Sequence, residues 1–290
     1  MSWLSVAPVA AAMLVAVVLG RVTLPLHPSW TARLLATVAG ALVVILAGSV
    51  GILALGYVLS FSSPAAGLVP AWWLPGDHYR VPHVLGLGAV AFLCLRLPAI
   101  VMVIVRRARE LRAAQAAAAT VVDSDIPFAL AVPGRRGGVL VSRGLLKGLN
   151  GPELEVVFQH ERAHLRYRHH HYLYMGALAR ALLPSLEPLS LRLRYALERW
   201  ADEEAADAVN DRELVARTIG KVALAQTSPS AGEAAFADWG VPGRVQALLT
   251  SAPGKNTVTG PCVVGGTGLA GSGLASTALQ LDHVLAFVLL

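Results

Sequence analysis

Charged residues are scarce at both ends of this 290-residue chain, which contains 24 basic and 18 acidic residues. Residues 1–105 and 256–290 together hold only six of them, namely Arg21, Arg33, Asp77, Arg80, Arg96 and Asp282. The other 36 lie in 106–255, while 55% of the whole chain is apolar. This distribution excludes an ordinary soluble protein and predicts two membrane-embedded ends around a water-facing middle.

Cysteine is also rare. Cys94 and Cys262 both lie in apolar runs and form no Cys-x-x-Cys pair, which excludes a disulfide framework and a thiolate zinc site. The net charge of +6 comes without a basic helix or an aromatic-basic pattern, so it indicates contact with anionic lipid and not with nucleic acid. Arginine dominates the basic residues and alanine and glycine are abundant, which favours a bacterial source.

Four apolar runs are long enough to cross a bilayer. They are 4–20 (extending to 26), 34–61, 84–105 and 256–281. A secretory signal peptide is the rival interpretation of the first run, but this run lacks a basic start and a good cleavage region. We therefore expect a mainly α, multi-pass membrane protein with about four spans.

The flanks of these runs predict the orientation. Arginines lie around the first connection and after the third run, at Arg21, Arg33, Arg106, Arg107, Arg109 and Arg112. The connection 62–83 instead carries Trp72, Trp73 and Tyr79, as an interfacial aromatic belt would. The positive-inside rule then places the N-terminus outside and the polar middle in the cytoplasm.

Three regions follow from these patterns. Residues 1–105 form a membrane domain, 106–255 a cytoplasmic domain, and 256–290 a C-terminal region with the last span. Within the middle region, 108–119 is predicted to be helical and to extend the third span. The short apolar runs 127–134 and 138–142 are separated by a GRRG turn and predict a β-hairpin.

A helix is predicted to begin near residue 152. Asn150 is a candidate N-cap with Glu153 three residues later, and Pro152 suits the first turn. Pro184 and Pro188 are expected to end the apolar stretch 172–186, which either dips into the membrane or lies on it. Residues 191–209 are again strongly helical by composition.

The helix from 152 contains the sequence His-Glu-x-x-His. His160 and His164 are four residues apart, so they project from one face, with Glu161 beside them. Two imidazole nitrogens in this arrangement bind zinc, and the glutamate can accept a proton from the attacking water and return it to the leaving amine. The motif predicts one catalytic Zn²⁺, with Glu161 as the base.

A catalytic zinc ion usually has a third protein ligand. Glu198 is the candidate because it lies on the helix 191–209, and Asp202 follows it at i+4 on the same face. Asp202 can then accept the second ring N–H of a ligating histidine and fix its tautomer. His169, His170 and His171 are predicted to be polar or interfacial residues, with accessory metal binding as the alternative.

The stretch from Pro127 through His164, followed by ALERWADEEAADA, resembles membrane zinc metallopeptidases of the BlaR/MecR antirepressor type. It is more distantly similar to the HtpX-like and CAAX prenyl protease group. The likeness covers roughly 120–210 and implies a gluzincin-like domain held among transmembrane helices. It also implies zinc ligands at His160, His164 and Glu198, a catalytic base at Glu161 and support from Asp202.

The HtpX-like relatives carry an arginine three residues before the glutamate ligand, where this chain has Tyr195 next to Arg194. These two residues are the candidates for stabilising the oxyanion. The edge of the predicted hairpin could bind an extended peptide by strand addition, although plain core packing explains the same pattern.

The leading hypothesis is a membrane-embedded zinc metalloendopeptidase that cleaves a protein substrate, either a transcriptional repressor or a membrane protein, at the cytoplasmic face. The second is a non-catalytic signalling or scaffolding component with a structural zinc domain. A transporter or channel is disfavoured because the spans lack paired acids.

Overall fold

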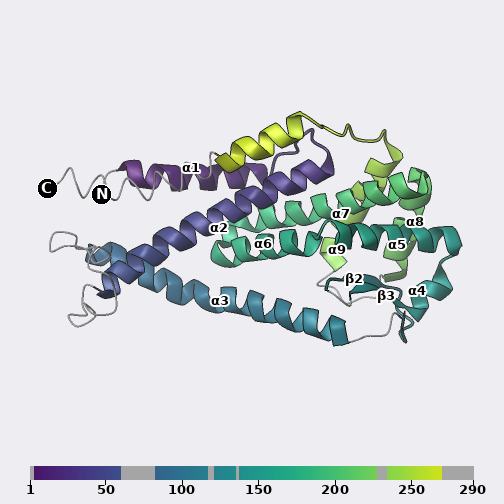
Figure 1. Ribbon diagram of the computed structural model, residues 1–290, viewed down its shortest axis with the longest axis horizontal. Helices are drawn as coiled ribbons and strands as arrows, with labels where there is room; N and C mark the ends of the chain where they lie inside the picture. The colour runs from purple at the N-terminus through teal and green to yellow at the C-terminus, as the bar shows by residue number, and fades with distance from the viewer. Residues whose placement is uncertain (1–2, 60–81, 117–120, 135–136, 227–233, 270–290) are drawn as a thin grey trace.

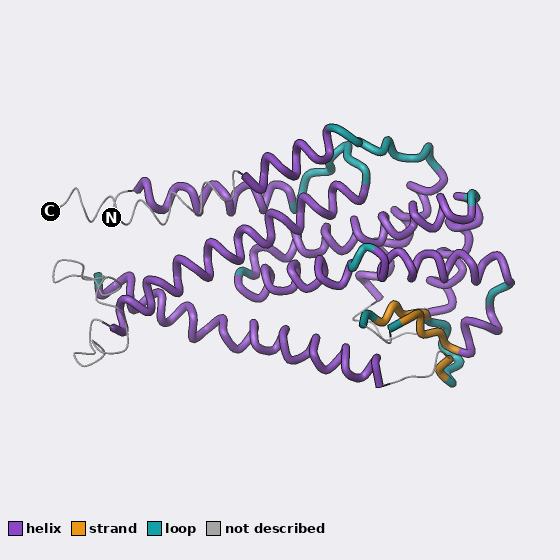
Figure 2. The backbone as a smooth tube through the Cα atoms, viewed as in Figure 1, coloured by secondary structure: helices purple, strands orange, loops and turns teal. Residues whose placement is uncertain are grey.

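The computed structural model describes residues 3–59, 82–116, 121–134, 137–226 and 234–269 (Figure 1). Long helices dominate these residues, and one small sheet lies at one end of the molecule (Figure 2). This confirms the mainly α fold. The interfacial aromatic residues predicted at Trp72, Trp73 and Tyr79 lie outside the described residues, as does the second half of the run 256–281.

Three apolar helices come first: α1 (Trp3–Leu19), α2 (Pro28–Leu59) and α3 (His83–Ala116). Among the described residues, two segments are long and apolar enough to cross a membrane, Pro28–Val58 and His83–Ala113. They correspond to the predicted spans 34–61 and 84–105. The structure thus supports two spans and not clearly four, since α1 has only 17 residues and the last run is described only to residue 269.

The surface of α3 is suited to lipid. Its large exposed side chains are mostly apolar and include Leu95, Leu97, Val101, Met102 and Ile104. A continuous apolar surface of this kind is rare on proteins surrounded by water. Together with the length of α2 and α3, it favours a membrane location.

Figure 1 shows the ends of these helices relative to the sheet. The α1–α2 connection and the C-terminal end of α3 lie toward the end of the molecule that holds the sheet. Arg21 and Arg33 near the first of these ends, and the arginines 106–112 near the second, therefore share one side with the polar region. This arrangement is the one that the charge pattern predicts, and the orientation relative to the cytoplasm stays a prediction.

The sheet has three strands, β1 (Val121–Val122), β2 (Ala129–Val132) and β3 (Gly138–Ser142), in the order β1-β3-β2. β2 and β3 pair antiparallel with Ala129 opposite Val141, which confirms the predicted hairpin. β1 adds to β3 in parallel and was not predicted, because a two-residue strand leaves no alternating pattern to recognise.

Helix α5 (Gly151–Arg166) follows the short α4 (Arg143–Gly148). The Asn150 side chain accepts a hydrogen bond from the backbone N–H of Glu153, and the Glu153 carboxylate accepts one from the backbone N–H of Asn150. This capping box, with Pro152 in the first turn, confirms the predicted start of the helix.

Next come α6 (His169–Leu182), a 3₁₀ turn η3 (Pro184–Leu186) and α7 (Glu187–Val209). The prediction for Pro188 was wrong: it does not end the preceding helix but lies in the first turn of α7, where a missing N–H costs nothing. The apolar stretch 172–186 forms most of α6, which packs against both α2 and α3 and lies between them (Figure 1).

Two buried clusters hold these helices together. The larger one joins α1, α2, α6 and α7 and contains Leu35, Leu42, Leu193, Leu197 and Trp200. The smaller one joins α5 and α7 to α8 (Arg212–Gln226) and α9 (Ala234–Leu249) through Val156, Ala205, Val215 and Leu248. Helix α7 belongs to both clusters and therefore connects the apolar helices to the polar region. The predicted domain boundaries stay a prediction.

The capping box gives a test of the fold. Asn150→Ala should lower the free energy of unfolding by about 1 kcal/mol, because the N–H of Glu153 loses its acceptor. Asn150→Ser keeps a capping oxygen and should cost much less. Chemical unfolding in detergent measures both, and an equal loss in the two variants would contradict the capping role.

Candidate metal centre

Helices α5 and α7 bring three potential metal ligands together. The Nε2 atoms of His160 and His164 lie 3.2 Å apart. The carboxylate of Glu198 lies 3.5 Å from Nε2 of His160 and 3.9 Å from Nε2 of His164. One ligand atom from each residue falls within 4.8 Å of the others. The residues predicted from spacing alone are therefore adjacent in the structure.

These distances suit a tetrahedral zinc ion. Bonds of about 2.0–2.1 Å in a tetrahedron place neighbouring ligand atoms about 3.4 Å apart. Two imidazoles and one carboxylate also form a donor set found at catalytic zinc sites, where the fourth position remains for water or substrate. The three side chains consequently fit one Zn²⁺.

Asp202 lies behind His160 and is completely buried. Its carboxylate is 3.1 Å from Nδ1 of His160, so that nitrogen donates to Asp202 and Nε2 remains free to bind a metal. This is the contact that the i+4 spacing from Glu198 predicts.

Arg244 on α9 was missed by the sequence analysis. Its Nε and one terminal nitrogen donate to the two oxygens of Asp202, each at 2.7 Å. The other terminal nitrogen lies 3.2 Å from Glu198. Arg244 is the only basic residue in the apolar helix α9, and this isolation is the one signal in the sequence that it has a buried acidic partner.

The charges of the site are arranged for metal binding. Burial opposes ionisation, but the contacts with His160 and Arg244 hold the pKa of Glu198 well below its ordinary value. Burial likewise opposes protonation of His160, yet its hydrogen bonds to Asp202 and Glu198 raise its pKa to about 10. Burial lowers the pKa of His164 to about 4. A metal ion entering the site therefore replaces a proton on His160 and meets a neutral His164.

His169 has a different position from the one predicted. It is completely buried, and its Nδ1 lies 2.9 Å from Nδ1 of His164. A turn at Arg168, whose backbone is left-handed (φ 54°), separates α5 from α6 and places His169 next to His164. His169 can therefore accept the Nδ1 proton of His164 and leave Nε2 of His164 free. His171, by contrast, is exposed, as expected for a polar residue.

Glu161 lies between α5 and the sheet. Burial raises its pKa, and the nearby charge of Glu198 raises it further. The backbone of Ala131 in β2 lies near this carboxylate and offsets part of the rise. A partly buried carboxylate with a raised pKa, next to a metal site, is suited to accept and return a proton.

Arg194 and Tyr195, the candidates for stabilising the oxyanion, are more exposed than the three candidate ligands. Arg194 is exposed, and Tyr195 has 38% of its surface exposed. The hydroxyl of Tyr195 lies next to Gly243, because a Cβ on that glycine would be 3.0 Å from it. Tyr195 is therefore close to the segment that carries Arg244, and the oxyanion role of both candidates stays a prediction.

A His-Glu-x-x-His helix, completed by a glutamate from a second helix, defines a metal centre of the type that metallopeptidases use. Residues 95–187, about a third of the chain, match the family model described as Peptidase family M48, a family of zinc metallopeptidases. No curated protein and no solved structure matches the chain. The family match supports a metallopeptidase function.

The matched segment includes the sheet, α5 with His160, Glu161 and His164, and α6. It ends at residue 187, where α7 begins. The assignment of Glu198 as third ligand and of Asp202 as its support therefore rests on the geometry of the structure.

The role of Arg244 leads to a prediction about stability. Arg244→Gln leaves the buried carboxylate of Asp202 and the partly buried one of Glu198 without their cation and should lower the free energy of unfolding of the metal-free protein by about 3–5 kcal/mol. The matched control is Arg217→Gln, which breaks an exposed pair with Glu213 and should cost less than about 1 kcal/mol. Equal costs in chemical unfolding would contradict the account of Arg244.

A second prediction concerns His169. His169→Phe keeps the ring but removes the acceptor for His164, so the affinity for zinc should fall about 10- to 100-fold while the helix content is unchanged. Titration against a chelator of known affinity measures this effect. The control His171→Phe should bind zinc as the wild type does. An unchanged zinc affinity in His169→Phe would show that His169 does not orient His164.

Proposed function

We propose that this protein is a membrane-embedded zinc metalloendopeptidase that hydrolyses peptide bonds of a protein substrate at the cytoplasmic face. The observation that carries the proposal is the convergence of His160, His164 and Glu198, from two helices, beside the partly buried carboxylate of Glu161. The match to Peptidase family M48 supports the same chemistry.

His160, His164 and Glu198 would hold the zinc ion, with Asp202, Arg244 and His169 fixing their orientation. A bound zinc ion would polarise the scissile carbonyl and lower the pKa of a water molecule. The surrounding residues prepare the site for a metal. Asp202 contacts the second ring nitrogen of His160, His169 contacts that of His164, and Arg244 pairs with the charge of Glu198.

Glu161 is the proton carrier. Its carboxylate accepts a proton as water attacks the carbonyl carbon, and it donates that proton to the amide nitrogen as the C–N bond breaks. The raised pKa of Glu161 suits both steps, since a carboxyl group that protonates readily can serve first as base and then as acid.

Strand β2 is positioned to bind the substrate. The backbone N–H of Ser142 donates to the carbonyl of Phe128. The backbone N–H and C=O groups of Phe128, Leu130 and Val132 therefore point toward β3. The peptide groups of Ala129 and Ala131 then turn to the other edge, the side on which Ala131 contacts Glu161. In the part of the chain that the structure describes, no strand pairs with this edge. An extended peptide could add there by backbone hydrogen bonds.

The membrane context supports a substrate that is itself at the membrane or just below it. Both α2 and α3 pack on α6, which follows the metal-binding helix directly. We propose that the site faces the cytoplasm of a bacterial cell, with a transcriptional repressor or a membrane protein as substrate. The resemblance to the BlaR/MecR antirepressor type favours the repressor, whereas the HtpX-like resemblance favours the membrane protein.

The proposal is tested by comparing wild type with Glu161→Gln, both purified in detergent with zinc quantified. Both should bind one equivalent of zinc, because Glu161 is not a ligand. Cleavage of an unfolded protein should fall at least about 100-fold in the variant, because the proton carrier is lost.

The control is His160→Ala, which should lose zinc and activity together. If wild type and Glu161→Gln bind zinc and cut at the same rate, or if neither cuts, the peptidase proposal is wrong. A structural zinc domain in a signalling protein would then explain the site better.

A further inference from the structure

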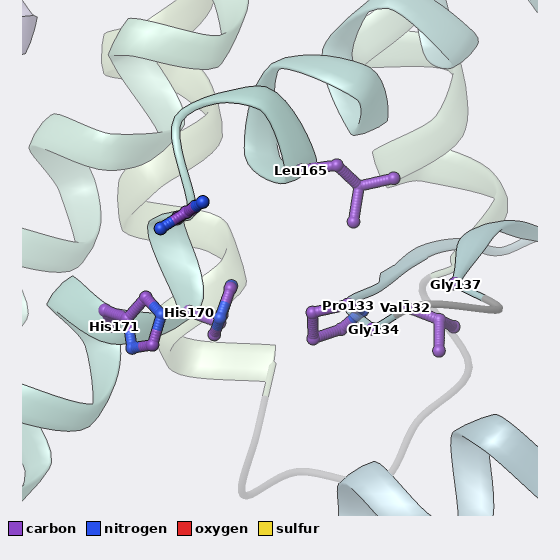
Figure 3. A pocket seen from close by; sticks show the side chains of 8 residues that line it. Val132, Pro133, Gly134, Gly137, Leu165, His170 and His171 are labelled. Carbon is purple, nitrogen blue, oxygen red and sulfur yellow. The ribbon is translucent and has the colours of Figure 1, made fainter.

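A cavity of about 370 Å³ opens where β2 ends. The end of the hairpin forms one side through Val132, Pro133, Gly134 and Gly137, and the junction of α5 and α6 forms the other through Leu165, Arg168, His170 and His171 (Figure 3). Nothing in the proposed chemistry uses this cavity, so its function is a separate question.

On both of its sides, the cavity is lined by a residue that is next in the sequence to one at the candidate metal centre. Leu165 directly follows the ligand His164, and Val132 directly follows Ala131, whose backbone contacts Glu161. From Ala131 to Gly134 an extended chain advances about 10 Å, at roughly 3.3 Å per residue. A peptide lying along β2 with its scissile bond at the metal therefore reaches the cavity within about two or three residues.

The lining of the cavity is rich in hydrogen-bond donors, and Arg168 gives it a positive charge. His170 and His171 add imidazole groups, and within the described residues no salt bridge joins any of these three side chains to an acid. Burial lowers the pKa of His170, and His171, Arg168 and Arg107 lower it further. His170 is therefore neutral near pH 7 and offers an N–H, while the positive charge beside it comes from Arg168, with Arg107 of α3 nearby.

The backbone adds to this potential. The cavity lies at the N-terminus of α6, a 14-residue helix whose N-cap, Arg168, makes no side-chain capping bond. The first turn of a helix carries a partial positive charge and unpaired N–H groups. None of the residues that line the cavity is acidic, so nothing in this lining balances the positive charge.

We propose that this cavity is a specificity subsite that binds an aspartate or glutamate side chain of the substrate, two or three residues from the scissile bond. The inference rests on the proposed peptidase function and names a feature of its substrates. Arg168 and His170 donate to the carboxylate, and Pro133, Gly134 and Leu165 enclose the chain that carries it.

The position of the cavity favours a peptide over an anionic lipid headgroup. One wall is the end of β2 itself, so the cavity continues the strand edge that carries the free peptide groups. A lipid headgroup has no peptide backbone and could not pair with that edge as a strand does.

The test measures binding to the full-length, zinc-loaded Glu161→Gln protein in detergent. The probes are fluorescent peptides of one neutral sequence, in which a single glutamate replaces glutamine at each position in turn. Glutamate at one position, two or three residues from the bond that the wild type cuts, should bind about tenfold more tightly than glutamine.

Arg168→Gln combined with His170→Gln should abolish this preference. The matched control is Arg166→Gln, which removes one charge from the same end of α5 but lies outside the cavity. It should keep the preference. A preference that survives the double substitution, or none at any position, overturns the inference.

Two further outcomes separate this inference from the proposed function. If the wild type cuts all peptides equally, with no preference for glutamate, the subsite is wrong and the peptidase stands. If glutamate peptides bind through Arg168 and His170 but the wild type cuts none of them, the cavity is a peptide site and the peptidase proposal fails. If glutamate and glutamine peptides bind equally, and the double variant binds phosphatidylglycerol vesicles more weakly than the protein without these two substitutions, the cavity is a lipid site and the inference is wrong.

Discussion

The contact of Arg244 with Asp202 and Glu198 is the interaction on which the metal centre depends. Asp202 is completely buried and Glu198 is partly buried, and holding these two carboxylates there without a cation would be costly. Arg244 supplies that cation from α9 and binds both oxygens of Asp202, which fixes the carboxylate against His160. The contacts with Arg244 and His160 keep both acids ionised. Glu198 can therefore bind a metal, and Asp202 can accept a hydrogen bond from the ring of His160.

Helix α7 links this centre to the apolar helices. Glu198 and Asp202 face α5, whereas Leu193, Leu197 and Trp200 pack into the core shared with α1, α2 and α6. Arg33 of α2 lies over the ring of Trp200, at 4.7 Å from its centre. The Trp200 indole N–H and the Tyr167 hydroxyl both donate to Glu204. The position of Glu198, the candidate third ligand, is therefore tied to the packing of a candidate membrane helix.

The parts of this site that sequence could predict are those that depend on local periodicity. The i+4 spacings of His160 with His164 and of Glu198 with Asp202 define helix faces, and the cap at Asn150 fixes where α5 begins. Arg244 could not be found this way, because it lies 42 residues from Asp202 and meets it only through the packing of α9. His169 was missed because its burial depends on the turn at Arg168, whose left-handed backbone no propensity rule predicts for an arginine.

The most direct test of the central claim is X-ray absorption spectroscopy of the zinc-loaded protein, compared with Glu198→Gln. The account predicts a zinc ion bound by two imidazoles and carboxylate or water oxygens at about 2.0–2.1 Å. It also predicts that the spectrum of the variant changes while the imidazole signal persists. A zinc ion bound by sulfur, or an identical spectrum in the variant, would contradict the assignment of His160, His164 and Glu198.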